Sequence, residues 1–206
     1  MKNQPATSVA VYRSEHYTFR SLWSAAERLR ESGEVDEANG LWPLLAATLL
    51  AFTAFEGFVN EAIESVAPEE WADERKLFAT GKHTGTMGKA VFLADRAGIA
   101  LRRESRPFST VAELCSWRNE LVHPRTTRIK GEALVVALSA KPRHAKPTVF
   151  KKLERPGFVE RCFTDIAALA DQLLDGLRAK DSVPVSHLGR KALWGPVGSG
   201  HVSLKE

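Results

Sequence analysis

The feature that most constrains the fold is a long apolar stretch from Leu41 to Val66. At 100° per residue, its large apolar side chains fall on one stripe with the period of an α-helix. Pro43 is tolerated in the first turn of such a helix, and Pro68 lies just beyond its end. We therefore predict one long helix here. Its stripe consists of Leu41, Leu45, Leu49, Phe52, Phe55, Val59 and Ile63.

Four other segments repeat apolar residues at helical spacing, namely 15–32, 87–97, 109–122 and 158–177. Gly33 is a stop signal for the first of them, and Pro124 ends the third because the residue before proline avoids the α region. No internal repeat is evident. The pattern predicts an all-α fold, a bundle of four to five helices.

Two regions depart from the helical pattern. Around 126–150 the chain has β-branched residues beside a turn-like Lys130-Gly131-Glu132, which favours a small β-hairpin excursion. From 181 onward it is rich in Pro, Gly, Ser and His, which is typical of a mobile tail that docks through Trp194. We therefore predict a single helical domain over 1–180 and a partly ordered C-terminal tail over 181–206.

The composition narrows the class of protein. A chain of 206 residues with 44% hydrophobic residues can bury a sizeable core. Cys115 and Cys162 belong to no cysteine or histidine cluster, so we expect neither a disulfide nor a zinc site, and no other metal or cofactor. No apolar leader is evident at the N-terminus, and Glu56 and Asn60 interrupt the longest apolar stretch. We expect a cytoplasmic protein without a membrane span.

Charge is distributed unevenly along the chain. The segment 27–75 has twelve acids and three bases, a net charge of −9, whereas 101–152 has twelve bases and four acids, a net charge of +8. A basic segment of this kind attracts nucleic acid. Two solvated faces of opposite sign that help subunits meet are an equally good interpretation.

The basic segment contains Trp117-Arg118-Asn119-Glu120-Leu121-Val122-His123-Pro124, near the end of a predicted helix. Asn119 and His123 are four residues apart and share a face, so the amide can hydrogen-bond the imidazole and fix its tautomer. The planar guanidinium of Arg118 suits phosphate oxygens. Alternatively, Arg118 is a structural ion-pair residue and His123 caps the helix.

RNA cleavage without a metal needs a base for the 2′-hydroxyl, an acid for the leaving 5′-oxygen, and positive charge on the transition state. One arginine and one histidine supply only part of this set. A two-fold dimer that brings two copies of the motif together supplies two of each. The motif is therefore chemically sufficient only when it is doubled.

Glu56 lies within the apolar stripe of the long helix, where we expect its carboxylate to be buried. A buried carboxylate is costly unless it is paired and hydrogen-bonded. Arg118 is the favoured partner, with Lys89, Arg96 or solvent as alternatives. Asn60 lies one turn further on and extends the polar network.

The Arg118-Asn119-x-x-x-His123-Pro124 segment and the helix around Glu56 resemble the HEPN domains (higher eukaryotes and prokaryotes nucleotide-binding) over roughly 41–124. The resemblance implies a helical bundle that dimerises with its two motifs facing across a cleft. It implies cutting of RNA without metal to leave a 2′,3′-cyclic phosphate, in a toxin or antiviral effector often neutralised by a nucleotidyltransferase-type antitoxin. Arg118 and His123 are then catalytic, and Asn119 is the orienting residue. Other members serve as non-catalytic scaffolds.

Several further residues have two interpretations each. Arg125, Arg128 and Lys130 follow the motif, where they hold flanking phosphates or belong to a solvated loop. Trp117 stacks on a base or belongs to the core. The remaining histidines lack the spacing of metal ligands and are expected at the surface; they are His16, His83, His144, His187 and His201.

Overall fold

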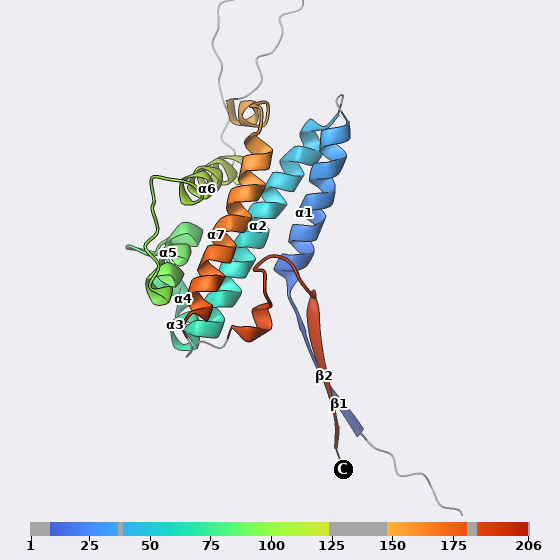
Figure 1. Ribbon diagram of the computed structural model, residues 1–206, viewed down its shortest axis with the longest axis vertical. Helices are drawn as coiled ribbons and strands as arrows, with labels where there is room; N and C mark the ends of the chain where they lie inside the picture. The colour runs from blue at the N-terminus through green and yellow to red at the C-terminus, as the bar shows by residue number, and fades with distance from the viewer. Residues whose placement is uncertain (1–8, 37–38, 124–147, 181–184, 206) are drawn as a thin grey trace, which may run out of the picture.

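A computed structural model of the chain describes residues 9–36, 39–123, 148–180 and 185–205 (Figure 1). The described chain is mostly helical and forms a helical bundle, so the predicted all-α class is confirmed. Each of the five predicted helices is present, with ends that differ by a few residues. They are α1 (Thr18–Val35), α2 (Leu41–Val66), α5 (Gly85–Ala97), α6 (Phe108–Val122) and α7 (Phe158–Arg178).

The sequence did not predict the short elements that lie between these helices or flank them. Two single-turn helices follow α2, and a 3-10 turn precedes α7. The expected β-hairpin around 126–150 falls largely outside the described residues. The short elements are α3 (Pro68–Ala72), α4 (Glu74–Leu77), η1 (Thr148–Lys152), η2 (Ser186–Leu188), β1 (Val9–His16) and β2 (Gly198–Lys205).

Helix α2 is the centre of the bundle. Helices α1 and α7 pack along it, while α5 and α6 contact both α2 and α7 and cover their other side (Figure 1). The phenylalanines Phe52, Phe55 and Phe58 of α2 are fully buried. Burial of such large apolar side chains is the main force that holds the helices together. Because α2 contacts α1, α5, α6 and α7, polar groups on its buried faces are held between neighbouring helices.

Helix α1 does not stop at Gly33 but continues to Val35. The glycine is buried where α1 meets α2, and a Cβ atom there would lie 2.7 Å from Cγ of Leu44. Gly33 therefore permits close packing of two helices. The sequence pattern alone cannot distinguish a glycine with this role from one that ends a helix.

The C-terminal region expected to be a tail contains an ordered strap across α1 and α7, which we define as residues 185–197. Val185, Leu188 and Leu193 of the strap are buried. The indole of Trp194, the expected docking residue, packs edge-on against Trp23 with ring centroids 5.1 Å apart. The strap then leads into β2.

Strands β1 and β2 form an antiparallel ribbon with a register from Val9↔Lys205 to His16↔Gly198. The ribbon points away from the bundle and pairs residues near the start of the sequence with residues near its end (Figure 1). Residues up to His16 therefore belong to a strand and not to the first helix, which begins at Thr18.

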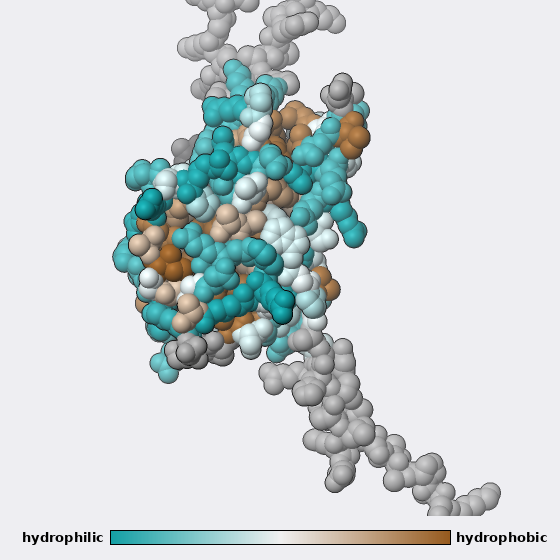
Figure 2. All heavy atoms as spheres, viewed as in Figure 1, coloured by the Kyte–Doolittle hydropathy of each residue, from teal (hydrophilic) through white to brown (hydrophobic). Residues whose placement is uncertain are grey.

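Figure 2 shows that hydrophilic side chains cover much of the visible face of the bundle, with hydrophobic ones between them. Helix α2 is long and apolar enough, by length and composition, to cross a membrane. The core helix of a soluble protein passes the same test, and this helix has its phenylalanines inside the bundle.

Candidate active site

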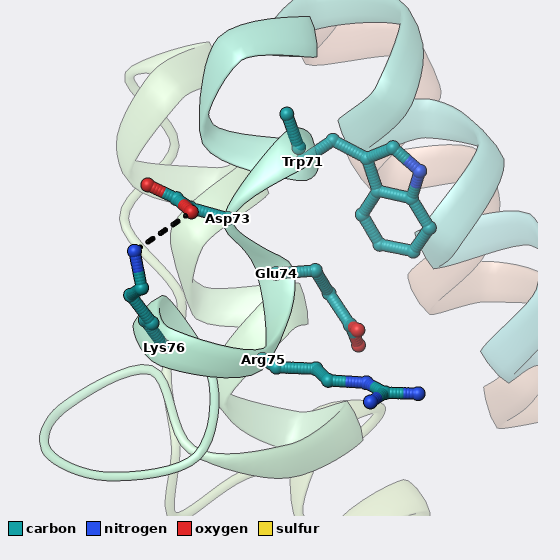
Figure 3. A pocket seen from close by; sticks show the side chains of 6 residues that line it. Trp71, Asp73, Glu74, Arg75 and Lys76 are labelled. Carbon is teal, nitrogen blue, oxygen red and sulfur yellow. Dashed lines mark hydrogen bonds and ion pairs between the residues drawn. The ribbon is translucent and has the colours of Figure 1, made fainter.

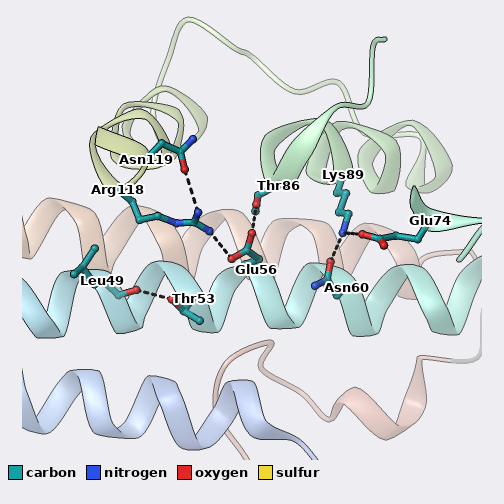
Figure 4. A network of polar contacts seen from close by, with 9 residues as sticks. All are labelled: Leu49, Thr53, Glu56, Asn60, Glu74, Thr86, Lys89, Arg118 and Asn119. Carbon is teal, nitrogen blue, oxygen red and sulfur yellow. Dashed lines mark hydrogen bonds and ion pairs between the residues drawn. The ribbon is translucent and has the colours of Figure 1, made fainter. Parts of the chain in front are cut away.

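A polar cleft of about 430 Å³ lies where α2, α5 and α6 meet. The three helices supply side chains of complementary charge to its walls, and Figure 4 shows how these side chains point toward one another. A volume of this size is typical of small-molecule pockets. The lining residues whose side chains carry polar or sulfur atoms are Glu56, Glu74, Thr84, Thr86, Met87, Lys89, Cys115, Arg118 and Asn119.

The centre of the cleft is the ion pair between Arg118 of α6 and Glu56 of α2. An Nη2 hydrogen of Arg118 is donated to Oε2 of Glu56 at 2.6 Å, so the favoured pairing is present. The guanidinium also lies over the ring of Phe52, with its Cζ 5.1 Å from the ring centroid. Arg118 is therefore held by a charge and by an aromatic face together.

The carboxylate of Glu56 is less buried than the helical stripe suggested, because its side chain is 31% exposed. The stripe continues on both sides of it with fully buried Phe52 and Val59. The difference arises because the cleft opens at this point between α5 and α6. The side chain of Arg118 is 21% exposed, so a ligand in the cleft can reach this ion pair.

Two further hydrogen bonds fix the pair. Thr86 of α5 donates its hydroxyl to Oε1 of Glu56 at 2.5 Å, and Arg118 donates from Nη1 to Oδ1 of Asn119 at 3.0 Å. Both carboxylate oxygens of Glu56 are thus satisfied. Arginine carries five N–H donors, so Arg118 retains donors for a ligand.

A second cluster surrounds Lys89 of α5, which is buried. Its Nζ donates to Oδ1 of Asn60 at 2.8 Å and to Oε1 of Glu74 at 2.6 Å (Figure 4). The same nitrogen lies 5.0 Å from the ring centroid of Trp71 and 5.5 Å from that of Phe78. Asn60 therefore belongs to the lysine cluster, and Lys89 is not the partner of Glu56.

His123 lies outside the lining of the cleft. It is the C-terminal cap residue of α6 and is exposed, and its backbone N–H donates to the carbonyl of Asn119 at 3.0 Å. Within the described residues, no hydrogen bond joins the side chains of Asn119 and His123, because the Asn119 amide oxygen accepts from Arg118 instead. In one chain, Arg118 faces the cleft while His123 lies one turn further along at the helix end.

Cys115 of α6 also lines the cleft, one turn before Arg118 and Asn119. Burial raises the pKa of its thiol, an effect that the positive charge of Arg118 opposes and the negative charge of Glu56 reinforces. A thiol with a raised pKa is mostly protonated and a poor nucleophile at neutral pH. Cys115 is therefore a wall of the cleft and not its reactive group. The core residue Cys162 has a pKa raised to about 12 by burial.

A second pocket of about 310 Å³ is formed by the consecutive residues 71–76 of α3 and α4 (Figure 3). Its polar walls include an ion pair between Lys76 and Asp73 at 3.1 Å. None of the site residues predicted from sequence lines it. Glu74 lines both this pocket and the cleft, so the two pockets share a wall, and the indole of Trp71 packs on Lys89 behind it.

The sequence missed two residues of the cleft network. Thr86 and Glu74 carry no periodic or motif signal, and only their spatial neighbours reveal their roles.

Trp117 is a core residue, packed edge-on against Phe158. Within the ranges that the structure describes, no group of three or more His, Cys, Asp or Glu side chains is arranged to hold a metal ion. Arg125, Arg128 and Lys130 lie outside the described residues.

Comparisons of the chain with family models, with curated proteins and with solved structures give no match.

Proposed function

We propose that this protein is a metal-independent endoribonuclease of the HEPN type that acts as a homodimer, with Arg118 and His123 of both subunits in one composite site. The observation that carries the proposal is the setting of Arg118. It is an arginine held rigidly by Glu56, Asn119 and Phe52 at the wall of an open polar cleft, on the last turns of a helix that ends in His123.

The geometry of Arg118 suits a phosphate group. An arginine fixed by second partners loses less side-chain freedom when it binds, and its planar fork recognises two oxygens at once. Its charge is shared with Glu56 in the resting state. As negative charge develops on a phosphate in the transition state, the free N–H donors of Arg118 stabilise that charge.

His123 supplies the proton transfers. One His123 removes the proton from a ribose 2′-hydroxyl, whose oxygen attacks the adjacent phosphorus. The bond from phosphorus to the 5′-oxygen breaks, and the His123 of the partner subunit protonates that oxygen. The products are a 2′,3′-cyclic phosphate and a 5′-hydroxyl end. Among the described residues one copy holds a single histidine at this helix end, so the proposal takes the second histidine from the partner copy.

The proposed biological setting is a cytoplasmic toxin or antiviral defence effector. Uncontrolled cleavage of RNA would harm the cell, so such an enzyme requires a neutralising partner. We propose an antitoxin of the nucleotidyltransferase type for that role, on the strength of the resemblance of the Arg118–His123 segment to the HEPN motif.

The test is cleavage of labelled RNA by the purified protein in the presence of EDTA. We expect cleavage that persists with EDTA, is lost in His123→Ala and Arg118→Ala, and is retained in the matched control His83→Ala. His83 is a partly exposed histidine that contacts Asp95 outside the cleft. Equal activity of the His123→Ala and wild-type proteins would overturn the proposal, provided that circular dichroism shows the same helix content.

A non-catalytic interaction or RNA-binding module is the second candidate. It is favoured by the observation that His123 is not among the residues that line the cleft with Arg118. In that case Arg118 serves only to join α6 to α2 through Glu56. RNA bound without products, at any enzyme concentration and with a monomeric mass in light scattering, would favour this second candidate.

A further inference from the structure

A basic and aromatic surface lies at the end of the bundle where α2 and α7 begin, away from the Lys89 cluster. We call it the η1 surface and define it by Trp42, Lys152, Arg155 and Arg161. The short turn η1, at the end drawn uppermost in Figure 1, connects its parts. Phe150 of η1 packs edge-on against Trp42 with ring centroids 6.0 Å apart, and Lys152 of the same turn reaches α6.

Three cations of the η1 surface converge on one carboxylate, that of Glu113. Lys152 donates to its Oε1 at 3.0 Å, and Arg155 and Arg161 approach the two carboxylate oxygens at 4.0 Å each. A single carboxylate neutralises one positive charge. The cluster therefore keeps an excess of positive charge in a small area, which attracts an anion from solution.

The two arginines of this cluster have unused donors. At 4.0 Å neither guanidinium is within hydrogen-bonding distance of Glu113, and neither donates a hydrogen bond within the described residues. Their side chains are 62% and 36% exposed, respectively. Arg161 is also oriented by the ring of Phe158, 5.5 Å from its Cζ. These guanidinium groups can donate hydrogen bonds to phosphate oxygens without breaking an existing hydrogen bond.

The aromatic part of the η1 surface indicates which polyanion fits it. Trp42 is 62% exposed, a large apolar area to leave in water beside a cationic cluster. The acidic side chains of a protein would satisfy the charges, but a carboxylate does not stack on an exposed indole. Single-stranded nucleic acid uses both, since its phosphates pair with cations and its unpaired bases stack on aromatic rings.

The charge of the chain around this surface points the same way. Between His123 and Arg161 the sequence carries ten bases and three acids, a net charge of +7. The η1 surface lies at the end of that segment, and the proposed catalytic histidine lies at its start. An RNA strand attracted to this basic segment would thus be held by residues of the same segment that contains the proposed catalytic histidine.

We propose that the η1 surface binds single-stranded RNA, with Trp42 stacking on a base and Arg155 and Arg161 contacting successive phosphates. The identification of the polyanion as RNA rests on the proposed function. The surface itself is distinct from the cleft around Arg118, so binding and cleavage can be measured separately.

The experiment is fluorescence anisotropy of a labelled single-stranded RNA, with His123→Ala as the parent protein so that nothing is cut. We expect Trp42→Ala to bind about 5- to 150-fold more weakly, the range that corresponds to loss of one base stack. Trp42→Phe should restore most of the affinity. The double variant Arg155→Ala/Arg161→Ala should make the slope of log affinity against log salt shallower by about 1.4, for two phosphate contacts.

The matched control is Arg102→Ala/Arg103→Ala, which removes two exposed arginines from the segment between α5 and α6. It should leave the slope of the parent unchanged. Equal slopes for the two double variants would overturn the inference, as would tighter binding of polyglutamate than of RNA. These outcomes leave the proposed function standing if wild-type protein cuts RNA. Conversely, RNA held by the η1 surface but never cut by wild-type protein refutes the ribonuclease and retains the surface.

Discussion

Two arginines in this bundle lie against α2 from opposite sides, and their surroundings differ in kind. Arg118 faces an open cleft and pairs with the carboxylate of Glu56. Arg20 of α1 is only 3% exposed, and it forms no ion pair with a carboxylate within the described residues. It donates to the carbonyl oxygens of Pro196 and Leu188 in the C-terminal strap, at 2.6 Å each.

These surroundings identify Arg20 as a structural arginine and Arg118 as a candidate functional one. Arg20 is enclosed by the strap, its Nε has no hydrogen-bond partner in the part of the chain that the structure describes, and burial lowers its pKa. No ligand can reach it, so its role is to fasten the strap to α1. Arg118 has a neighbouring cleft and unused donors, which a purely structural residue does not require. Exposure to a cleft, and not the presence of charge, distinguishes the two.

We expect the largest effect on stability from a substitution of the structural arginine, Arg20. Arg20→Ala leaves two backbone carbonyls without their donor and creates a cavity beneath the strap, so we expect a loss of about 3 kcal/mol of unfolding free energy. For a chain of this size that corresponds to a fall of roughly 6–12 °C in Tm, measurable by calorimetry. RNA cleavage per folded molecule should be unchanged.

An unchanged Tm in Arg20→Ala would show that the strap does not depend on this arginine. Loss of cleavage in protein that is still folded would contradict a purely structural role for Arg20, since this arginine would then be needed for activity.

The second prediction concerns the charge that holds Arg118. Glu56→Gln keeps the size of the side chain but removes its charge, so Arg118 loses its fixed orientation. We expect cleavage to fall about tenfold or more, because precise placement of a charged group matters most in the transition state. The unfolding free energy should change by only about 1 kcal/mol, as for other partly exposed ion pairs.

The control for Glu56→Gln is Glu70→Gln, the same substitution in an ion pair with Arg96 outside the cleft. Its cleavage rate should equal that of wild type. A larger effect on stability than on cleavage in Glu56→Gln would assign the Arg118 pair to the structural class of Arg20.

The third prediction concerns the hydroxyl of Thr86, which donates to Glu56 of the ion pair. Thr86→Val is nearly isosteric and removes only the hydrogen bond to Oε1 of Glu56. A hydrogen bond to a charged acceptor contributes about 1.5–3 kcal/mol. Because this carboxylate is partly exposed, we expect a stability loss of about 1.5 kcal/mol and cleavage about fivefold slower. Thr53→Val is the control, because Thr53 bonds only to the backbone of its own helix, at Leu49 (Figure 4). Equal cleavage by the two valine variants would contradict a positioning role for Thr86.

We expect the smallest effect on stability at Asp95, which pairs with Lys82 and His83 on the exposed surface. Hydrogen bonds from Lys82 and His83 lower the pKa of Asp95 below its ordinary value of 3.8. A lowered pKa in the folded state stabilises the fold above pH 3.8, and this contribution is lost as the pH falls through the folded-state pKa. Asp95→Asn should therefore lower Tm slightly at pH 7, and the difference from wild type should vanish in strong acid. A difference in Tm that grows toward low pH would contradict this assignment.

The sequence by itself determined the helices and the central ion pair. The period of the apolar residues in α2 predicted its full length, because a helix that lies against neighbours on several sides must repeat its apolar face. A charged residue within that face is costly when unpaired, so Glu56 predicted a cation, and Arg118 of α6 is that cation. Both inferences depend on local periodicity and on the cost of an isolated charge.

Only the tertiary structure decided which other groups complete the network. Thr86 and Glu74 reach the cleft from segments with no motif, and Arg20 finds its acceptors 168 and 176 residues along the chain. The pairing of β1 with β2 likewise joins residues that are more than 180 positions apart in the sequence. Local patterns carry no record of such partners, because backbone carbonyls are the same at every residue and a threonine hydroxyl bonds to whatever acceptor the fold brings near. The sequence specified where charge had to be satisfied, and the packing of the helices selected the groups that satisfy it.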